Sequence, residues 1–171
     1  MENNKKVIPI FFTVDDNYTP FLSVVLSSII DNCSKDYHYV IKVLSTNVSD
    51  KNKKKISKFA SKDFDIEFVD LNDYMNKIQE KLYTRDYYTS TTYFRLFIPE
   101  LYPQYDKAIY LDSDVIILSD IANLYNIDIG DNLLGATPDG IMGSIDVFKE
   151  YAEKVVGVRD YNKIGRAHVW T

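Results

Sequence analysis

The segment KAIYLDSDVIIL, residues 107–118, places two aspartates, Asp112 and Asp114, inside an otherwise apolar run. The run predicts a strand, and side chains two positions apart in a strand point to the same face. Two carboxylates held on one face repel each other and are costly to desolvate. A Mg²⁺ or Mn²⁺ ion that also binds a diphosphate relieves this repulsion, because both ions prefer hard oxygen ligands. The alternative is that backbone donors and a Lys or Arg satisfy both carboxylates.

The rest of the chain alternates predicted strands with predicted helices. Apolar and β-branched runs predict further strands over residues 7–14, 39–45, 64–71 and 133–137. Helical spacing predicts helices over residues 21–30, 49–61, 72–81, 90–97 and 143–156. This rhythm predicts an α/β fold with a mostly parallel central sheet flanked by helices, in which ligands bind at the carboxyl ends of the strands. The strand over 64–71 alternates apolar and acidic residues, which is typical of a half-exposed or edge strand.

Composition narrows the class of protein. The chain has 171 residues, enough for one domain, and its net charge of -5 argues against a nucleic-acid partner. A single cysteine, Cys33, rules out an internal disulfide and fits a reducing compartment, and the polar start Met1–Lys6 is unlike a signal peptide. We therefore expect a cytoplasmic protein. No glycine precedes Gly130, so a bound nucleotide has to be held by side chains and metal instead of a glycine-rich loop.

The last eight residues differ in composition from the rest of the chain. Residues 164–171, IGRAHVWT, resemble a translated sequencing adapter in which a stop codon is read as tryptophan. The sequence therefore predicts a non-native tail over 164–171. Residues 1–163 are then predicted to be the N-terminal part of a single domain from a longer natural protein.

A second polar cluster, Asp15-Asp16-Asn17-Tyr18, follows the first predicted strand. Asp and Asn are common N-caps, so one interpretation is a cap for the helix that begins near Phe21. The other is a nucleotide contact, in which Asp15 and Asn17 hydrogen-bond a base and a ribose while Tyr18 packs on the ring.

Arg95 lies among apolar and aromatic residues in STTYFRL, residues 90–96. A core-facing arginine needs an anionic partner. A structural carboxylate, the aspartate pair, or the sugar and phosphates of a nucleotide could each fill that role.

Four segments together carry a resemblance to a known family. FTVDDNY (12–18), STTYFRL (90–96), YLDSDV (110–115) and LLGATPD (133–139) resemble, in order and spacing, the motifs of glycosyltransferase family eight. Members of this family are retaining enzymes of the GT-A fold, typified by bacterial lipopolysaccharide galactosyl- and glucosyltransferases and by glycogenin.

The resemblance implies roles for individual residues. In the aspartate motif, Asp112 and Asp114 would hold Mn²⁺, or Mg²⁺, and through it the diphosphate of a UDP-sugar, with Ser113 between them at the same site. Asp15 and Asn17 would contact uracil and ribose, with Thr13 and Tyr18 beside them. Arg95 would contact the donor sugar or diphosphate. Asp139 would lie on the sugar or acceptor side. Arg95 and Asp139 are thus the catalytic candidates.

The implied reaction moves a hexose, glucose or galactose, from UDP to a glycan or surface-glycoconjugate acceptor such as lipopolysaccharide, with retention of configuration. The family continues with Phe-Asn-(Ala/Ser)-Gly, Gln-Asp and His-x-x-Gly-x-x-Lys-Pro-Trp segments that this chain does not contain. We therefore expect little or no turnover from this chain. Peripheral membrane association is expected only through the missing C-terminal part.

Two alternatives remain at the level of sequence. LDSDVI (111–116) also fits a haloacid-dehalogenase-type phosphatase, with Asp112 as nucleophile and Asp114 as general acid/base. A non-catalytic nucleotide-binding fragment is the other alternative. The transferase needs both the Asp15/Asn17 cluster and Arg95, whereas the phosphatase needs neither.

Overall fold

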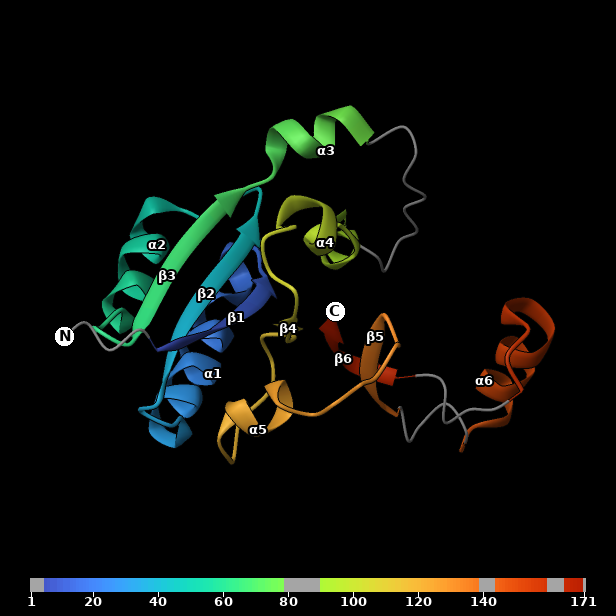
Figure 1. Ribbon diagram of the computed structural model, residues 1–171. Helices are drawn as coiled ribbons and strands as arrows, with labels where there is room; N and C mark the ends of the chain where they lie inside the picture. The colour runs from blue at the N-terminus through green and yellow to red at the C-terminus, as the bar shows by residue number, and fades with distance from the viewer. Residues whose placement is uncertain (1–4, 79–89, 139–143, 160–164, 171) are drawn as a thin grey trace.

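The computed structural model describes residues 5–78, 90–138, 144–159 and 165–170, which form one six-stranded sheet with helices on both faces (Figure 1). The strands are β1 (Lys6–Thr13), β2 (Tyr37–Ser45), β3 (Phe64–Asp70), β4 (Ala108–Tyr110), β5 (Leu134–Pro138) and β6 (Gly165–Trp170). Their order across the sheet is β3-β2-β1-β4-β6-β5. The first four are parallel, and β6 is antiparallel to both β4 and β5. The predicted α/β fold with a mostly parallel sheet is confirmed.

Strand β1 lies at the point where the strand order reverses. The chain passes from β1 to β2 and β3 on one side, and later returns to place β4 on the other side of β1. The pairing of β1 with β4 continues beyond β4, since the Leu111 amide donates to the Phe11 carbonyl at 3.0 Å. In open α/β sheets, such a reversal opens a crevice at the carboxyl ends of the two strands. Those ends are Thr13 in β1 and Tyr110 in β4.

The helices cover the two faces of the sheet unequally. The α-helices are α1 (Thr19–Asn32), α2 (Asp50–Ile56), α3 (Asn72–Ile78), α4 (Ile98–Leu101), α5 (Ile121–Tyr125) and α6 (Asp146–Tyr151). Shorter elements are the 3₁₀ helices η1 (Asp16–Tyr18), η2 (Ser57–Phe59) and η4 (Ser90–Phe97) and the π-helix η5 (Ala152–Val156). Helices α1, α2 and α5 pack on one face, and α3, η4 and α4 pack on the other.

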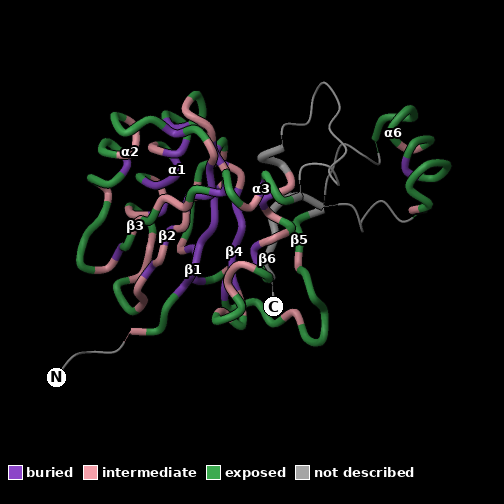
Figure 2. The backbone as a smooth tube through the Cα atoms, turned by 90° about the horizontal axis from the view of Figure 1, so that it is seen from above, coloured by how far each residue is buried: buried purple, intermediate pink, exposed green. Residues whose placement is uncertain are grey.

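Alternation along β1 separates the two cores. Ile10 and Phe12 point into the core under α1, whereas Phe11 points into the core under η4 with Phe94 and Tyr110. The buried residues accordingly follow the central strands and the inner side of α1 (Figure 2). Tyr110 therefore lies on the η4 face, which decides its neighbours at the strand end.

Most predicted elements form close to their expected bounds, and β3 is an edge strand as predicted. The predicted strand over 107–118 is wrong, because the strand ends at Tyr110. Beyond the turn at Ser113–Asp114, the backbone of Ile117 bonds to side chains of α1, namely Ser28 and Asn32, instead of to a strand. Apolar residues of this segment are exposed, among them Leu118 at 84%, so the run was not a buried strand.

Three further differences concern element type. Residues 90–97 form a 3₁₀ helix, and helix α4 continues through Pro99, which was expected to lie beyond the end of a helix. Pro99 is tolerated because it occupies the first turn, where its missing N–H has no partner to lose. Helix α5 was not predicted, and its N-cap is Asp120, whose carboxylate accepts from the Ala122 amide.

Strand β6 comes from the segment that was predicted to be a non-native tail. Gly165–Trp170 pairs with β4 and with β5, with Val169 opposite both Ile109 and Gly135. The non-native origin of residues 164–171 stays a prediction, but these residues occupy the position between β4 and β5. None of the helices within the described ranges has the length and apolar character needed to cross a bilayer.

Candidate functional site

The sequence-predicted residues that the structure brings together meet at the carboxyl ends of β1 and β4. Thr13 ends β1, Tyr110 ends β4, and Asp112 follows Tyr110 on the same face by alternation. Helix η4 crosses this face and places Arg95 over the Tyr110 ring. Segments that are far apart in sequence thus supply one polar site at the reversal of strand order.

A continuous set of contacts joins these four side chains. The Thr13 and Tyr110 hydroxyl oxygens are 2.6 Å apart, and the Tyr110 hydroxyl donates to Asp112 Oδ1 at 3.1 Å. Arg95 Nη2 donates to the same oxygen at 3.1 Å. The Arg95 guanidinium carbon also lies 4.5 Å from the centre of the Tyr110 ring, in cation–π geometry. Asp112 is therefore the anionic partner that an arginine in this position needs.

Tyr110 remains a neutral hydrogen-bond donor. Its side chain is 1% exposed, and this burial raises the pKa of its hydroxyl to about 12, although Arg95 and the hydrogen bond from Thr13 act in the opposite direction. The Asp112 charge adds to the rise. At neutral pH the hydroxyl therefore keeps its proton and can donate it to Asp112.

The two aspartates of the turn retain oxygens for a cation. The Asp112 side chain is 40% exposed, and both of its hydrogen bonds within the described residues go to Oδ1, which leaves Oδ2 available. Asp114 is exposed, and its carboxylate has no hydrogen bond or ion pair within those same residues. These hard oxygen donors fit Mg²⁺ or Mn²⁺. No third His, Cys, Asp or Glu joins them in the described part of the chain, so the remaining ligands there would be waters or ligand oxygens.

Ser113, between the two aspartates, is buried at 5% exposure. The expectation that Asp112 and Asp114 share one face of a strand is wrong, since Ser113 and Asp114 form a turn. The turn still presents both carboxylates at the end of β4.

Asp15 caps the helical segment after β1. Its Oδ1 accepts from the Asn17 amide at 2.9 Å and from the Tyr18 amide at 3.0 Å, which satisfies two of the free N–H groups at the start of η1. Asn17 and Tyr18 are exposed, and the Tyr18 ring packs against Phe21 with a centroid distance of 5.5 Å. Asp15 is therefore a cap, but of η1 and not of the helix near Phe21 as expected, because α1 has no side-chain hydrogen bond at its N-cap, Tyr18. The side chains of Asn17 and Tyr18 remain exposed.

Asp16 has a role that sequence reasoning missed. Its Oδ1 accepts from the Ser49 amide and hydroxyl, both at 2.8 Å, and from the Asn52 side-chain amide at 2.9 Å. These bonds, the Ser49 amide first, hold the pKa of the Asp16 carboxyl below its ordinary value. Asp16 therefore ties the loop after β1 to the start of α2. No local sequence signal could have shown this, because the donors lie more than thirty residues away along the chain.

One predicted site residue cannot be placed, and one site residue was not predicted. Asp139 lies outside the described residues. Tyr110 is part of the YLDSDV motif, but no signal in the sequence marked its side chain as a member of the site.

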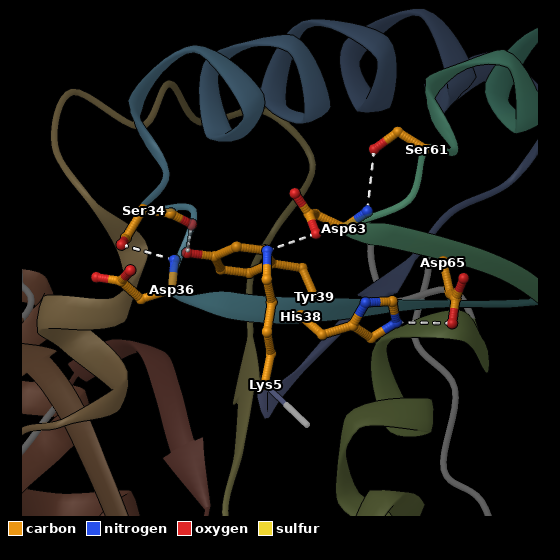
Figure 3. Close-up of polar contacts among 8 residues, drawn as sticks. All are labelled: Lys5, Ser34, Asp36, His38, Tyr39, Ser61, Asp63 and Asp65. Atoms are coloured by element: carbon orange, nitrogen blue, oxygen red, sulfur yellow. Dashed lines mark hydrogen bonds and ion pairs between the residues drawn. The ribbon is translucent and has the colours of Figure 1, made fainter. Parts of the chain in front are cut away.

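The amino ends of β1, β2 and β3 carry a different kind of polar cluster (Figure 3). There Lys5 pairs with Asp63 at 2.6 Å and His38 with Asp65 at 2.8 Å. The Tyr39 hydroxyl donates to the Ser34 carbonyl at 3.1 Å. The Asp63 and Asp65 carboxylates thus have cationic or imidazole partners, unlike Asp114. The carboxyl-end site is therefore the stronger candidate for a cation.

Open α/β sheets bind their ligands at the reversal of strand order, and the carboxylates of this site lie there. The chain belongs to glycosyl transferase family 8, whose family model matches residues 9–171. Among solved structures, a bifunctional glycosyltransferase, WbbM, superposes with a TM-score of 0.82 at 27% identity over 96% of this chain and 31% of its own. The galactosyltransferase LgtC, solved with donor and acceptor sugar analogs, gives a TM-score of 0.71 at 25% identity over 95% of this chain and 57% of its own. The fold is therefore the GT-A type that the motifs implied.

Curated relatives agree with the family. A putative glycosyltransferase of Haemophilus influenzae is 33% identical over 153 residues, covering 90% of this chain and 44% of the relative. General stress protein A of Bacillus subtilis is 27% identical over 139 residues, covering 78% of this chain and 47% of the relative. The chain thus spans less than half the length of these two relatives.

Proposed function

We propose that this chain forms the donor-binding half of a retaining glycosyltransferase that transfers a hexose, glucose or galactose, from a UDP-sugar to a glycan or surface-glycoconjugate acceptor. The observation that carries the proposal is the arrangement around Asp112. It lies at the carboxyl end of β4, beside the end of β1, with one oxygen held by Tyr110 and Arg95 and the other available. LgtC, a galactosyltransferase of the same fold, supports the reaction class.

Asp112 and Asp114 are the residues that would hold Mn²⁺ or Mg²⁺, with Ser113 buried between them. The bound cation would supply charge neutralisation for the diphosphate of the donor. Arg95 adds a second positive charge on the η4 side of Asp112, where it can contact the donor sugar or diphosphate. Arg95 is accordingly our catalytic candidate, together with Asp139.

The nucleoside is proposed to bind along the loop after β1. Asn17 offers an exposed amide, and Tyr18 offers a half-exposed ring that is backed by Phe21. Asp15 uses Oδ1 for capping, so its second oxygen is the one that would meet uracil or ribose. Thr13, at the end of β1, lies between this loop and Asp112.

The acceptor and the cellular compartment are also part of the proposal. A hexosyltransferase of this kind would act on glycans such as lipopolysaccharide and would work in the cytoplasm. Family membership favours the transferase over a phosphatase in which Asp112 is a nucleophile. The Arg95–Asp112 ion pair agrees with this preference, since the phosphatase interpretation gives Arg95 no role.

The test is a calorimetric titration of UDP into the purified 171-residue chain, with Mn²⁺ and with EDTA. We expect binding that requires Mn²⁺ and that disappears in the Asp112→Asn/Asp114→Asn variant. A folded chain, checked by circular dichroism, that binds no UDP with Mn²⁺ would contradict the proposal. Hydrolysis of p-nitrophenyl phosphate by the same sample would instead favour the phosphatase.

A further inference from the structure

Tyr110 has no direct role in the proposed chemistry, yet its hydroxyl lies between two residues that do. It is 2.6 Å from the Thr13 hydroxyl and 3.1 Å from Asp112 Oδ1. The residues that flank it belong to β1 and to the loop after β4, which are joined by no other side-chain hydrogen bond among the described residues of the site. The tyrosine hydroxyl is thus the link between the two strand ends.

The direction of the two hydrogen bonds follows from the number of protons. An ionised carboxylate only accepts, so the single proton of the Tyr110 hydroxyl goes to Asp112. The same hydroxyl must then accept from Thr13, whose hydroxyl donates. The chain of donors runs from Thr13 through Tyr110 to Asp112, and removal of the threonine donor would take away one group that orders the Tyr110 hydroxyl.

Packing fixes the tyrosine in this arrangement. Its ring is buried, and the Arg95 guanidinium covers one face at 4.5 Å while donating to the same Asp112 oxygen. Two donors on Oδ1 define the orientation of the carboxylate. Oδ2 accepts no hydrogen bond among the described residues and is the oxygen left for a cation.

We propose that Tyr110 is a positioning residue, whose hydroxyl, ordered by Thr13, holds the Asp112 carboxylate so that Oδ2 is presented to the divalent cation of a metal–UDP complex. This inference rests on the proposed function. Groups that orient a metal ligand through a hydrogen bond typically change metal affinity about 10–100-fold when removed. The cost arises because the ligand then samples orientations that do not bind.

The primary experiment compares wild-type chain with Tyr110→Phe by calorimetric titration of UDP in Mn²⁺ and in EDTA. The variant keeps the ring under Arg95 and loses only the hydroxyl. We expect Mn²⁺-dependent UDP affinity to fall about 10–100-fold, with any residual affinity in EDTA unchanged. A purely structural role would lower the melting temperature and leave the ratio of the two affinities unaltered.

Tyr39→Phe is the matched control. Tyr39 is fully buried, and its hydroxyl also donates to a backbone carbonyl and approaches a carboxylate, that of Asp120, at the opposite ends of the strands. Loss of this hydroxyl should affect stability only. Mn²⁺-dependent UDP affinity should stay within about twofold of wild type.

Variants of Thr13 test the link independently and keep the tyrosine intact. Thr13→Val removes the donor and should weaken Mn²⁺-dependent binding several-fold, whereas Thr13→Ser retains the donor and should bind like wild type. In the Tyr110→Phe background, Thr13→Val should add no further loss, because both act through one chain of bonds. A direct contact of Thr13 with the nucleotide would instead persist in that background.

The outcomes separate the inference from the proposed function. A wild-type chain that does not bind UDP with Mn²⁺ overturns the proposed function and this inference with it. A wild-type chain that binds, together with a folded Tyr110→Phe variant of equal affinity, overturns the inference alone. If Tyr110→Phe unfolds, the Thr13 variants decide: equal affinity of Thr13→Val and Thr13→Ser overturns the inference.

Discussion

Two acidic segments come after strands at the same end of the sheet, and they use their carboxylates in opposite ways. After β1, Asp15 accepts from two backbone amides and Asp16 accepts from the amide and side chains at the start of α2. After β4, Asp112 accepts from the side chains of Tyr110 and Arg95 and from no other group of the described residues. Asp114 has no hydrogen bond in the part of the chain that the structure describes.

The difference arises from the backbone structure on the C-terminal side of each segment. A helical segment starts directly after Asp15, and its free N–H groups attract the nearest carboxylate. The segment after Asp114 is irregular, and the next helix is capped by Asp120 instead. Carboxylates that accept from backbone amides shape the loop, whereas carboxylates without such donors keep oxygens available for a cation.

The largest expected effect on UDP affinity is that of Asp114→Asn, compared with the single variant Asp15→Asn. Asp114→Asn removes one of the two carboxylates proposed to bind the cation, so Mn²⁺-dependent UDP affinity should fall by at least about 100-fold. Asp15→Asn should retain the cap and lower UDP affinity much less. Calorimetry in Mn²⁺ and EDTA measures both. Equal losses in the two variants would show that the two segments do not differ in function.

Arg95 is the second test, because it acts on Asp112 through both charge and stacking. Arg95→Ala should weaken Mn²⁺-dependent UDP binding about tenfold or more, since it removes one donor to Oδ1 and a positive charge near the diphosphate. Arg95→Lys should recover little of this loss, because an ammonium cannot reproduce the planar contact with Tyr110. Full recovery by lysine would mean that the stacked geometry is unimportant.

The cap at Asp15 gives a smaller effect, on stability. Asp15→Ala should lower the free energy of unfolding by about 1 kcal/mol, the usual cost of an N-cap, whereas Asp15→Asn should cost only a few tenths. Urea denaturation followed by circular dichroism measures the difference. An alanine variant as stable as wild type would argue against the cap.

The smallest expected effect is the pH dependence of the Asp16 contribution. The folded-state pKa of Asp16 lies below its ordinary value of about 3.9, so the charged form is favoured by folding. Its stabilisation is therefore fully present above about pH 4 and is lost as the pH falls through the lower, folded-state value.

The measurement is the melting temperature of wild type and Asp16→Asn between about pH 7 and pH 3. Wild type should melt slightly higher at neutral pH, and the two curves should converge in acid. A difference that persists unchanged at low pH would mean that the Asp16 carboxylate is not what ties the loop to α2.

The local sequence pattern predicted most strands and helices, but it did not predict where β4 ends. Runs of apolar residues predicted β1, β2, β3 and β5, and the alternation in residues 64–71 predicted an edge strand correctly. The run after Asp114 was misassigned because apolar character alone does not distinguish a strand from a segment that lies against a helix. There the backbone of Ile117 found its partners in α1 side chains, 85 and 89 residues earlier.

In the candidate site, too, the sequence predicted some residues and missed others. Sequence motifs identified Thr13, Arg95 and the aspartate pair, and the structure joins Thr13, Arg95 and Asp112 through Tyr110, whose part no motif indicated. Asp16 is a comparable omission at the other segment, where its donors come from the start of α2. Both omissions concern hydrogen bonds between residues that are distant in sequence.

The features that the sequence by itself determined have a local cause: the alternation of strands and helices, the absence of a glycine-rich loop before Gly130, and the motifs of the family. Tertiary structure alone decided which carboxylate oxygens accept hydrogen bonds from the protein and which remain available to a cation. Thr13 and Tyr110 are 97 positions apart, and they meet only because β4 pairs beside β1 after the strand order reverses. The orientation of Asp112 depends on that pairing, since the donors to a carboxylate are set by the strands and helices packed around it.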